Sequence, residues 1–308
     1  MKNLLLREHV RQKIDARVDR ILKELGQPPP PLRLEDVRDL LELSREYFTG
    51  DDDTLMAQSL SRLTIAGKQV IRRPTLLFEA IRKFDLKALY LPDRKRIMID
   101  QNVPEKKHRW LEAHEIGHGL LPWHELIMLG DDEHTPTPAC HEKLEAEANY
   151  AGGQLLFLRQ RFIDEARSGP ATFAAVQKLH RSYGNTMTTT LWRYVEHFDL
   201  ELPIVAMISG HPHPARRAED FNAAMPCRHF IQSPAFAAHF SQITEHALFE
   251  EVMDYCGPQT GGPLGSAELT LADDNGEGHV FAFETFYNRH DALTLGVHLR
   301  KAMIAVGF

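Results

Sequence analysis

The sequence predicts an α+β fold that is mostly helical, with a mixed α+β unit toward the C-terminus. Apolar residues recur at spacings of three and four along residues 4–25, as on one face of an amphipathic helix. Two short apolar runs flank a turn within residues 86–100, which is typical of a β-hairpin. Near the end of the chain, β-rich runs flank the turn residues Asp273-Asp274-Asn275-Gly276. These patterns together predict helices and antiparallel strands in one chain.

Helices dominate the expected first part of the chain. Gly26 ends the first helix, and the proline run at residues 28–31 cannot continue it. The elements expected next are a helix over 34–48, a helical stretch near 73–84, the hairpin over 86–100, a helix over 105–121, a loop over 122–140 and a long helix over 141–162. Two further helices within 170–198 are expected to meet at a turn over residues 183–185.

The C-terminal third mixes both kinds of element. We expect a strand over 203–210, helical stretches within 234–256, a loop rich in Gly and Pro over 257–265, and β-rich runs over 267–271 and 279–286. The chain has 308 residues, and a typical domain has about 100–200. The length therefore allows two or three units, each with a core of its own.

Composition argues against several classes of protein. With 36 Lys and Arg against 43 Asp and Glu, the net charge of −7 disfavours a protein that coats nucleic acid through its phosphates. Cys140, Cys227 and Cys256 show no CxxC spacing, so we expect neither a disulfide framework nor a cysteine zinc knuckle. No apolar run reaches the ~18 residues of a membrane span, and the first residues lack a secretion signal. We expect a cytoplasmic protein with no membrane partner.

The sequence His114-Glu115-Ile116-Gly117-His118 is the feature that most directly indicates chemistry. On a helix, positions four apart lie on one face, so the imidazoles of His114 and His118 can reach the same zinc ion. Glu115 is displaced around the helix and can act beside the metal as a base. The alternative is a helix that carries two partly exposed histidines without a metal.

The next long helix offers a third ligand. Catalytic zinc usually takes three protein ligands and keeps a fourth position for water. Glu145 can supply a carboxylate, and Asn149, one turn later, can hold an imidazole in place. Glu147 points about 160° away from Glu145 and is expected to be solvated. Gly152 and Gly153 each cost the helix about 1 kcal/mol relative to Ala, which a close crossing with the histidine helix would explain; a simple bend is the alternative.

The expected loop between these helices contains further residues that could bind a metal: His124, Asp131, Asp132, His134, Cys140 and His141. We expect most of them to be solvated. One histidine of this loop could donate a hydrogen bond to a developing oxyanion, but the sequence does not single it out. Cys140 beside His141 is a disfavoured metal pair, because a lone thiol lacks a second partner at metal spacing.

Residues 86–158 resemble the ImmA/IrrE family of metallopeptidases. The resemblance rests on the hairpin, on Ala113-His114-Glu115-Ile116-Gly117-His118, and on Glu145-Ala146-Glu147-Ala148-Asn149-Tyr150-Ala151. It implies a thermolysin-like metallopeptidase core in which His114, His118 and Glu145 bind zinc and Glu115 is the catalytic base. The Leu-Leu-Met-Pro common in the family is replaced here by Leu155-Leu156-Phe157-Leu158, a departure at the end of the helix rather than at the metal.

The resemblance also implies a function and a partner. It implies a zinc-dependent endopeptidase that cleaves a regulatory protein, a helix-turn-helix transcriptional repressor, and so controls stress or mobile-element genes. Mn²⁺ or another divalent metal is an alternative to Zn²⁺, because sites of His and carboxylate accept several ions. The competing hypothesis is a DNA-binding or signal-sensing transcriptional regulator with a structural or vestigial metal site.

Three units are expected on this basis. They are an ImmA/IrrE-like metallopeptidase domain over 1–165, a helix-turn-helix-like linker segment over 166–200, and an α+β domain over 201–308. The linker segment could bind DNA, since its second helix starts with Thr188-Thr189-Thr190, but three basic residues (Lys178, Arg181 and Arg193) are few for groove binding. An αα-hairpin that packs domains together or holds substrate is therefore favoured.

The C-terminal domain is hypothesised to sense a signal or recruit substrate, by analogy with family members that carry a C-terminal sensor. Cys227-Arg228-His229-Phe230 and Asn288-Arg289-His290-Asp291 could line a ligand pocket. The favoured alternative places both stretches at strand ends and in loops.

Overall fold

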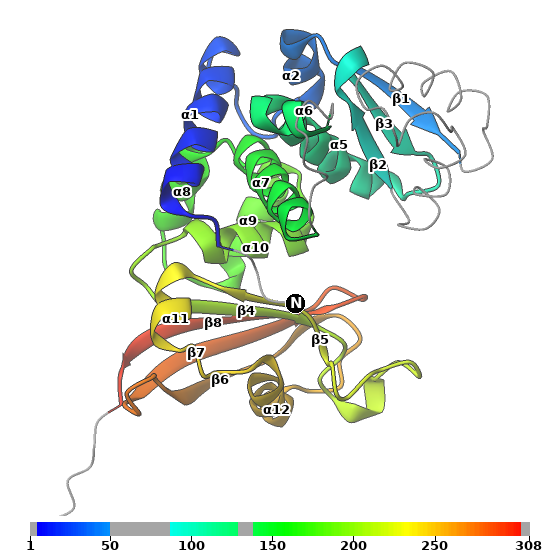
Figure 1. Cartoon of the computed structure of the whole chain (residues 1–308). Helices are drawn as coiled ribbons and strands as arrows, with labels where there is room; N and C mark the ends of the chain where they lie inside the picture. Colours follow the sequence, from blue (N-terminus) through cyan, green and yellow to red (C-terminus); the bar gives the residue numbers. More distant parts are fainter. Residues whose placement is uncertain (1–4, 50–86, 129–137, 303–308) are drawn as a thin grey trace, which may run out of the picture. The chain divides into compact units, whose positions relative to one another are not determined.

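A computed structural model describes residues 5–49, 87–128 and 138–302 of the chain (Figure 1). Over these residues the fold is mixed α+β with two separate sheets, which confirms the expected class. The chain divides into two compact units, one built from residues 6–159 and the other from Gln160 onward. No helix of the described ranges is long and apolar enough to cross a bilayer.

The first unit combines helices with a small sheet. In chain order its elements are α1 (Glu8–Glu24), α2 (Leu34–Leu41), β1 (Ser44–Phe48), β2 (Ala88–Leu91), a 3-10 turn (Pro92–Arg94), β3 (Arg96–Asp100), α5 (Glu105–Leu120), α6 (Pro122–Met128) and α7 (Pro138–Leu156). The strands follow the order β1-β3-β2. β2 pairs with β3 in antiparallel register, whereas β1 runs parallel to β3. The predicted hairpin and the predicted helix over 105–121 are confirmed.

Three expectations for this unit are wrong. The long helix predicted over 141–162 spans Pro138–Leu156 instead, because Leu158 and Arg159 adopt left-handed conformations (φ 54° and 48°), and a separate helix starts at Gln160. The helix predicted over 34–48 ends at Leu41, because Glu42 adopts a left-handed conformation (φ 57°), and the chain continues as β1. The loop predicted over 122–140 begins instead with α6. The helical stretch predicted near 73–84 lies outside the described residues.

α5 and α7 cross at very short distance. A Cβ atom on Gly117 of α5 would stand 2.5 Å from the carbonyl oxygen of Ala148, and one on Gly152 of α7 would stand 2.6 Å from that of Ala113. Real Cβ atoms do not approach backbone atoms this closely, so both positions require glycine. The close crossing predicted from Gly152 is confirmed, and it brings the histidine helix against the next long helix.

Ion pairs anchor the neighbouring elements to these two helices. Glu112 of α5 is almost fully buried and accepts hydrogen bonds from Arg38 Nε and Arg45 Nη1, each at 2.6 Å. The first arginine comes from α2 and the second from β1. On the other helix, the Tyr150 hydroxyl donates to Asp15 of α1 at 3.1 Å. Contacts from α1, α2 and β1 thus hold the two helices that carry the predicted site.

The second unit is built around a five-stranded antiparallel sheet. Its elements are α8 (Gln160–Arg167), α9 (Phe173–Tyr183), α10 (Met187–His197), β4 (Ile204–Ser209), a 3-10 turn (Pro214–Arg216), β5 (Cys227–Gln232), α11 (Pro234–His239), α12 (Glu245–Tyr255), β6 (Gly262–Ala272), β7 (Gly278–Tyr287) and β8 (Ala292–Lys301). The strand order is β5-β4-β8-β7-β6. The expected turn over residues 273–276 is confirmed between β6 and β7, where Asp273 accepts backbone hydrogen bonds from Asn275 and Glu277.

The C-terminal sheet is larger than predicted. β6 begins at Gly262, inside the expected loop over 257–265. Cys227 lies at the start of β5, and residues 288–291 connect β7 to β8, as the favoured alternative expects. One face of the sheet packs on α11 and α12 through a core that contains Phe236, Phe240 and Phe281.

α9 and α10 cover part of the same sheet from outside this core. Phe173 of α9 stacks on Phe286 of β7 with ring centroids 5.3 Å apart, and α10 packs on β4, β5 and β8. The two helices meet at Gly184, whose φ of 64° ends α9. Thr190 and Arg193 of α10 are buried, whereas a helix that reads a DNA groove exposes such side chains. The arrangement matches the favoured αα-hairpin.

Candidate metal centre

α5 places the two histidines of the pentad one turn apart. Ala113 and Ile116 are fully buried on this helix and hold it against the unit, so the histidines emerge at the edge of the apolar face. The His114 and His118 Nε2 atoms lie 3.2 Å apart, and the rings meet edge to face. Both imidazoles therefore point one nitrogen toward the same place.

Glu145 of α7 completes the group. Its Oε2 lies 3.2 Å from His114 Nε2, and its Oε1 lies 3.6 Å from His118 Nε2. One ligand atom from each of His114, His118 and Glu145 falls within 4.8 Å of the other two. The three residues predicted as metal ligands are thus brought together by the crossing of α5 and α7.

Asn149 lies where the sequence analysis expects it. Its Oδ1 is 2.9 Å from His114 Nδ1 and accepts a hydrogen bond from that nitrogen. With Nδ1 donating, the neutral His114 ring keeps a lone pair on Nε2, whereas the protonated ring can donate from Nε2 to Glu145. Burial by itself lowers the pKa of His114, but the hydrogen bond to Glu145 and the charges of Glu115 and Glu145 outweigh it, so the pKa is raised. These neighbours therefore favour the positively charged form of the His114 imidazole.

Glu115 is buried beside the three residues, with 6% of its surface exposed. Burial, together with the charge of Glu145, raises the pKa of its carboxyl to about 7, although His114 and a hydrogen bond from the backbone of Tyr90 oppose the change. A carboxyl with such a pKa can hold or release a proton near neutrality. Its position beside the histidines suits the role predicted for it.

The burial of His124 and Glu147 was not predicted from the sequence. Glu147 was expected to be solvated, as were most of the loop candidates, which include His124, yet His124 is fully buried and Glu147 is 3% exposed. His124 Nδ1 lies 3.0 Å from His118 Nδ1, and His124 Nε2 lies 3.1 Å from Glu147 Oε2. The same carboxylate oxygen accepts a hydrogen bond from Trp123 Nε1 at 2.6 Å. Burial acts to raise the pKa of Glu147, but the hydrogen bonds from His124 and Trp123 keep it lowered.

The sequence did contain a local indication that Glu147 is buried. Leu144, Ala148 and Ala151 are buried on α7, and Glu147 lies on this same apolar side of the helix. A carboxylate within an apolar stripe needs a buried partner, which here comes from α6, a helix that was predicted as loop. Of the other loop candidates, Asp131, Asp132 and His134 and the side chains of Cys140 and His141 lie outside what the structure describes.

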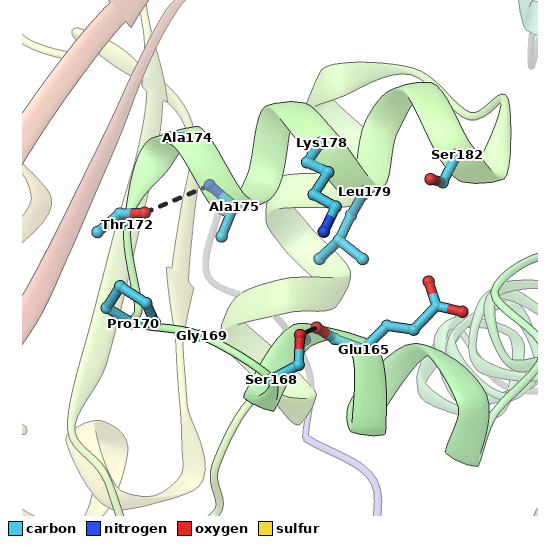
Figure 2. Close-up of a pocket in the computed structure, with 11 residues that line it drawn as sticks. Glu165, Ser168, Gly169, Pro170, Thr172, Ala174, Ala175, Lys178, Leu179 and Ser182 are labelled. Carbon is cyan, nitrogen blue, oxygen red and sulfur yellow. Dashed lines mark hydrogen bonds between the residues drawn. The ribbon is translucent and has the colours of Figure 1, made fainter.

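Two cavities lie apart from these residues. One, of about 440 Å³, belongs to the second unit and lies between α8 and α9, with Glu165, Thr172 and Lys178 in its lining (Figure 2). The other, of about 430 Å³, belongs to the first unit and is lined by residues that include Arg38 and Glu112. Neither is lined by His114, His118 or Glu145, so the candidate site is identified by its chemistry rather than by a cavity.

Comparisons with known proteins relate this part of the chain to a peptidase family. Residues 72–191 match a peptidase family model described as the IrrE N-terminal-like domain, and this range contains His114, Glu115, His118 and Glu145. No curated protein matches the chain. A solved structure titled Mycobacterium tuberculosis transcriptional regulator is similar over 95% of this chain and 80% of that chain, with a TM-score of 0.51 and 15% sequence identity. At this identity the likeness is one of fold alone.

Proposed function

The chain carries an IrrE N-terminal-like domain over residues 72–191, consistent with the ImmA/IrrE family, and on this premise we propose that it is a zinc-dependent endopeptidase that cleaves a regulatory protein. The observation that carries the proposal is the convergence of His114 Nε2, His118 Nε2 and a Glu145 carboxylate oxygen within 4.8 Å. Two imidazole nitrogens and one carboxylate are the protein ligands of many catalytic zinc sites, which keep one position open.

The residues present fit a cation. Asn149 accepts from His114 Nδ1, which leaves the lone pair of His114 Nε2 directed toward His118 Nε2, 3.2 Å away. Two nitrogens at that distance need a proton or a cation near them, and the Glu145 carboxylate adds a negative charge. A bound Zn²⁺, or Mn²⁺ in its place, would acidify a water molecule and polarise the scissile carbonyl.

Glu115 supplies the proton transfers of the proposed reaction. Its carboxylate takes a proton from the attacking water as the water oxygen bonds to the peptide carbonyl carbon. The carboxyl then gives that proton to the amide nitrogen as the C–N bond breaks, which releases an amine and a carboxylic acid, and the acid passes its own proton to the amine or to solvent. A purely structural metal site has no use for a buried carboxyl at this position.

A peptide could reach Glu115 along β2. Among the strands that the structure describes, β2 lies at one side of the order β1-β3-β2, and the backbone of Tyr90 in β2 hydrogen-bonds to Glu115. An extended peptide can add to the side of a sheet through backbone hydrogen bonds. The choice of a helix-turn-helix repressor as substrate rests on the resemblance to ImmA/IrrE, and the C-terminal α+β domain is proposed to sense the signal or recruit that substrate.

The test combines metal content with proteolysis of purified candidate repressors by the full chain. We expect zinc in the wild-type protein and in Glu115→Gln, cleavage only by the wild type, and loss of both zinc and cleavage in His118→Ala. Glu142→Gln is the matched control, because Glu142 is an exposed acid on α7. Equal proteolysis by the wild type and Glu115→Gln would reject the endopeptidase. Zinc without any proteolysis, together with salt-sensitive binding to duplex DNA, would favour the regulator with a structural metal site instead.

A further inference from the structure

A buried hydrogen-bonded chain leads from α6 and α7 to the second histidine of the pentad. It consists of Glu147, His124 and His118, and Trp123 joins it at Glu147. His124 is fully buried and Glu147 is 3% exposed, so water does not compete for these bonds. A buried polar group needs a hydrogen-bond partner, and in this chain the donor and the acceptor of each bond can be assigned.

The direction of every bond follows from Trp123. An indole N–H can only donate, so Glu147 Oε2 is the acceptor in the bond of 2.6 Å from Trp123 Nε1. The same oxygen lies 3.1 Å from His124 Nε2, and a carboxylate oxygen accepts there too. His124 therefore carries its hydrogen on Nε2. In the neutral ring, this leaves His124 Nδ1 with a lone pair.

His118 is the last member of the chain. Its Nδ1 lies 3.0 Å from His124 Nδ1, and because the latter accepts, His118 Nδ1 must carry a hydrogen and donate. The remaining nitrogen, His118 Nε2, then keeps its lone pair, and this atom faces His114 Nε2 at 3.2 Å and Glu145 Oε1 at 3.6 Å.

We propose that His124 and Glu147 are positioning residues that hold His118 in the tautomer with hydrogen on Nδ1, so that its Nε2 is ready to bind a metal ion. The inference rests on the proposed metal site and deepens it. Asn149 does the same for His114 through a different bond. Each ligating imidazole thus has its own hydrogen-bond acceptor, one on α7 and one on α6.

Without Glu147, the acceptor for His124 Nε2 is lost. His124 can then place its hydrogen on Nδ1 and donate to His118, which moves the hydrogen of His118 to Nε2, the atom that must coordinate. A metal ion would have to restore the other tautomer when it binds. Outer partners of ligating histidines are worth about 10- to 100-fold in metal affinity.

The experiment reads the ring tautomers and the zinc affinity separately. Long-range nitrogen–proton NMR of the metal-free full chain, labelled only in histidine rings, reports which nitrogen of His118 carries hydrogen. Competition between the chain and a chelating dye for Zn²⁺ alone gives the affinity. We expect the Nδ1–H tautomer at His118 in the wild type. Glu147→Leu and His124→Phe should lose that tautomer preference and about 10- to 100-fold in zinc affinity.

Two further variants separate a positioning role from general damage. Glu147→Gln keeps an acceptor oxygen and should restore most of the tautomer preference and the affinity. Lys143→Met is the matched control, because Lys143 Nζ lies 3.7 Å from Glu147 Oε1 and is largely exposed. His118 with hydrogen on Nε2 in the wild type would overturn the inference, even if zinc binds. So would unchanged zinc affinity in folded Glu147→Leu and His124→Phe. A wild-type chain with the Nδ1–H tautomer but no zinc binding would instead reject the proposed function.

Discussion

The carbonyl oxygen of Ala148 lies 2.5 Å from the place where a Cβ atom on Gly117 would stand. A reciprocal contact, between Gly152 and the carbonyl oxygen of Ala113, lies along the same crossing. These contacts set the distance between α5 and α7. Since His114 and His118 lie on α5 and Glu145 lies on α7, the same contacts set the distance between the proposed metal ligands.

Gly117→Ala and Gly152→Ala should therefore weaken both the fold and the site. Overpacking a tight contact costs about 1–3 kcal/mol, because the backbone must move. We expect this loss in the free energy of unfolding, measured with urea, together with weaker zinc binding. Gly169→Ala is the control, since nothing lies within 4 Å of a Cβ at that position. Wild-type stability in both glycine variants would show that the helices do not depend on the contact.

Glu112 tests the anchoring of the histidine helix. Its buried carboxylate bonds to Arg38 and Arg45 at 2.6 Å each, and removing one partner of a buried ion pair costs about 3–5 kcal/mol. Glu112→Ala should lower the free energy of unfolding by about that amount. The double variant Glu112→Ala/Arg38→Ala should lose much less than the sum of the two single losses, because the charges act as a unit. Strict additivity in urea unfolding would contradict the coupling.

The buried carboxyl of Glu115 should make the metal-free chain less stable as pH rises. Burial raises its pKa to about 7, whereas an unfolded glutamate titrates near ~4.3. Between these values the unfolded chain has released the proton and the folded chain still holds it, so the free energy of unfolding falls with pH. The loss is absent below about pH 4, complete above about pH 7 and at most about 4 kcal/mol.

Glu115→Gln cannot release that proton and should lack this part of the pH dependence. Urea unfolding of both proteins between pH 4 and pH 8, in the presence of a chelator, measures the difference. The free energies of unfolding should diverge in favour of the variant as pH rises through this range. Parallel curves would show that the carboxyl is not perturbed by its surroundings.

Metal removal should lower thermal stability in a way that depends on the proposed ligands. A ligand present at 100 times its dissociation constant stabilises the folded state by about 2.7 kcal/mol. Adding Zn²⁺ to the chelated wild-type chain should therefore raise its melting temperature, and His114→Ala should not respond. A response of the same size in His114→Ala would place the zinc elsewhere on the chain.

Local patterns predicted the part of the site that lies on single helices. On a helix, residues four apart lie on the same face. The spacing therefore indicated that His114 shares a face with His118, and that Glu145 shares one with Asn149. Gly152 further indicated that the two helices cross closely. These predictions depend on neighbours within one or two turns, and for that reason they could be made from the chain alone.

The features that were not predicted depend on contacts with residues that are distant along the chain. β1 forms because Tyr47 and its neighbours pair in parallel with β3, some fifty residues later in the chain. No pattern within residues 44–48 indicates that pairing. The environment of Glu147 likewise depends on α6, which brings Trp123 and His124 to its carboxylate. Sequence periodicity could place Glu147 on a face of its helix but could not identify what covers that face.

The measurement that tests the central claim most directly is X-ray absorption at the zinc edge of the zinc-loaded full chain. We expect one zinc with two imidazole nitrogens at about 2.0–2.1 Å and a carboxylate oxygen at about 2.0–2.2 Å. His114→Ala and Glu145→Ala, treated with the same amount of Zn²⁺, are expected to lose this spectrum, because each variant lacks one of the three ligands. A sulfur ligand at about 2.3 Å, or a spectrum unchanged in both variants, would contradict a site made of His114, His118 and Glu145.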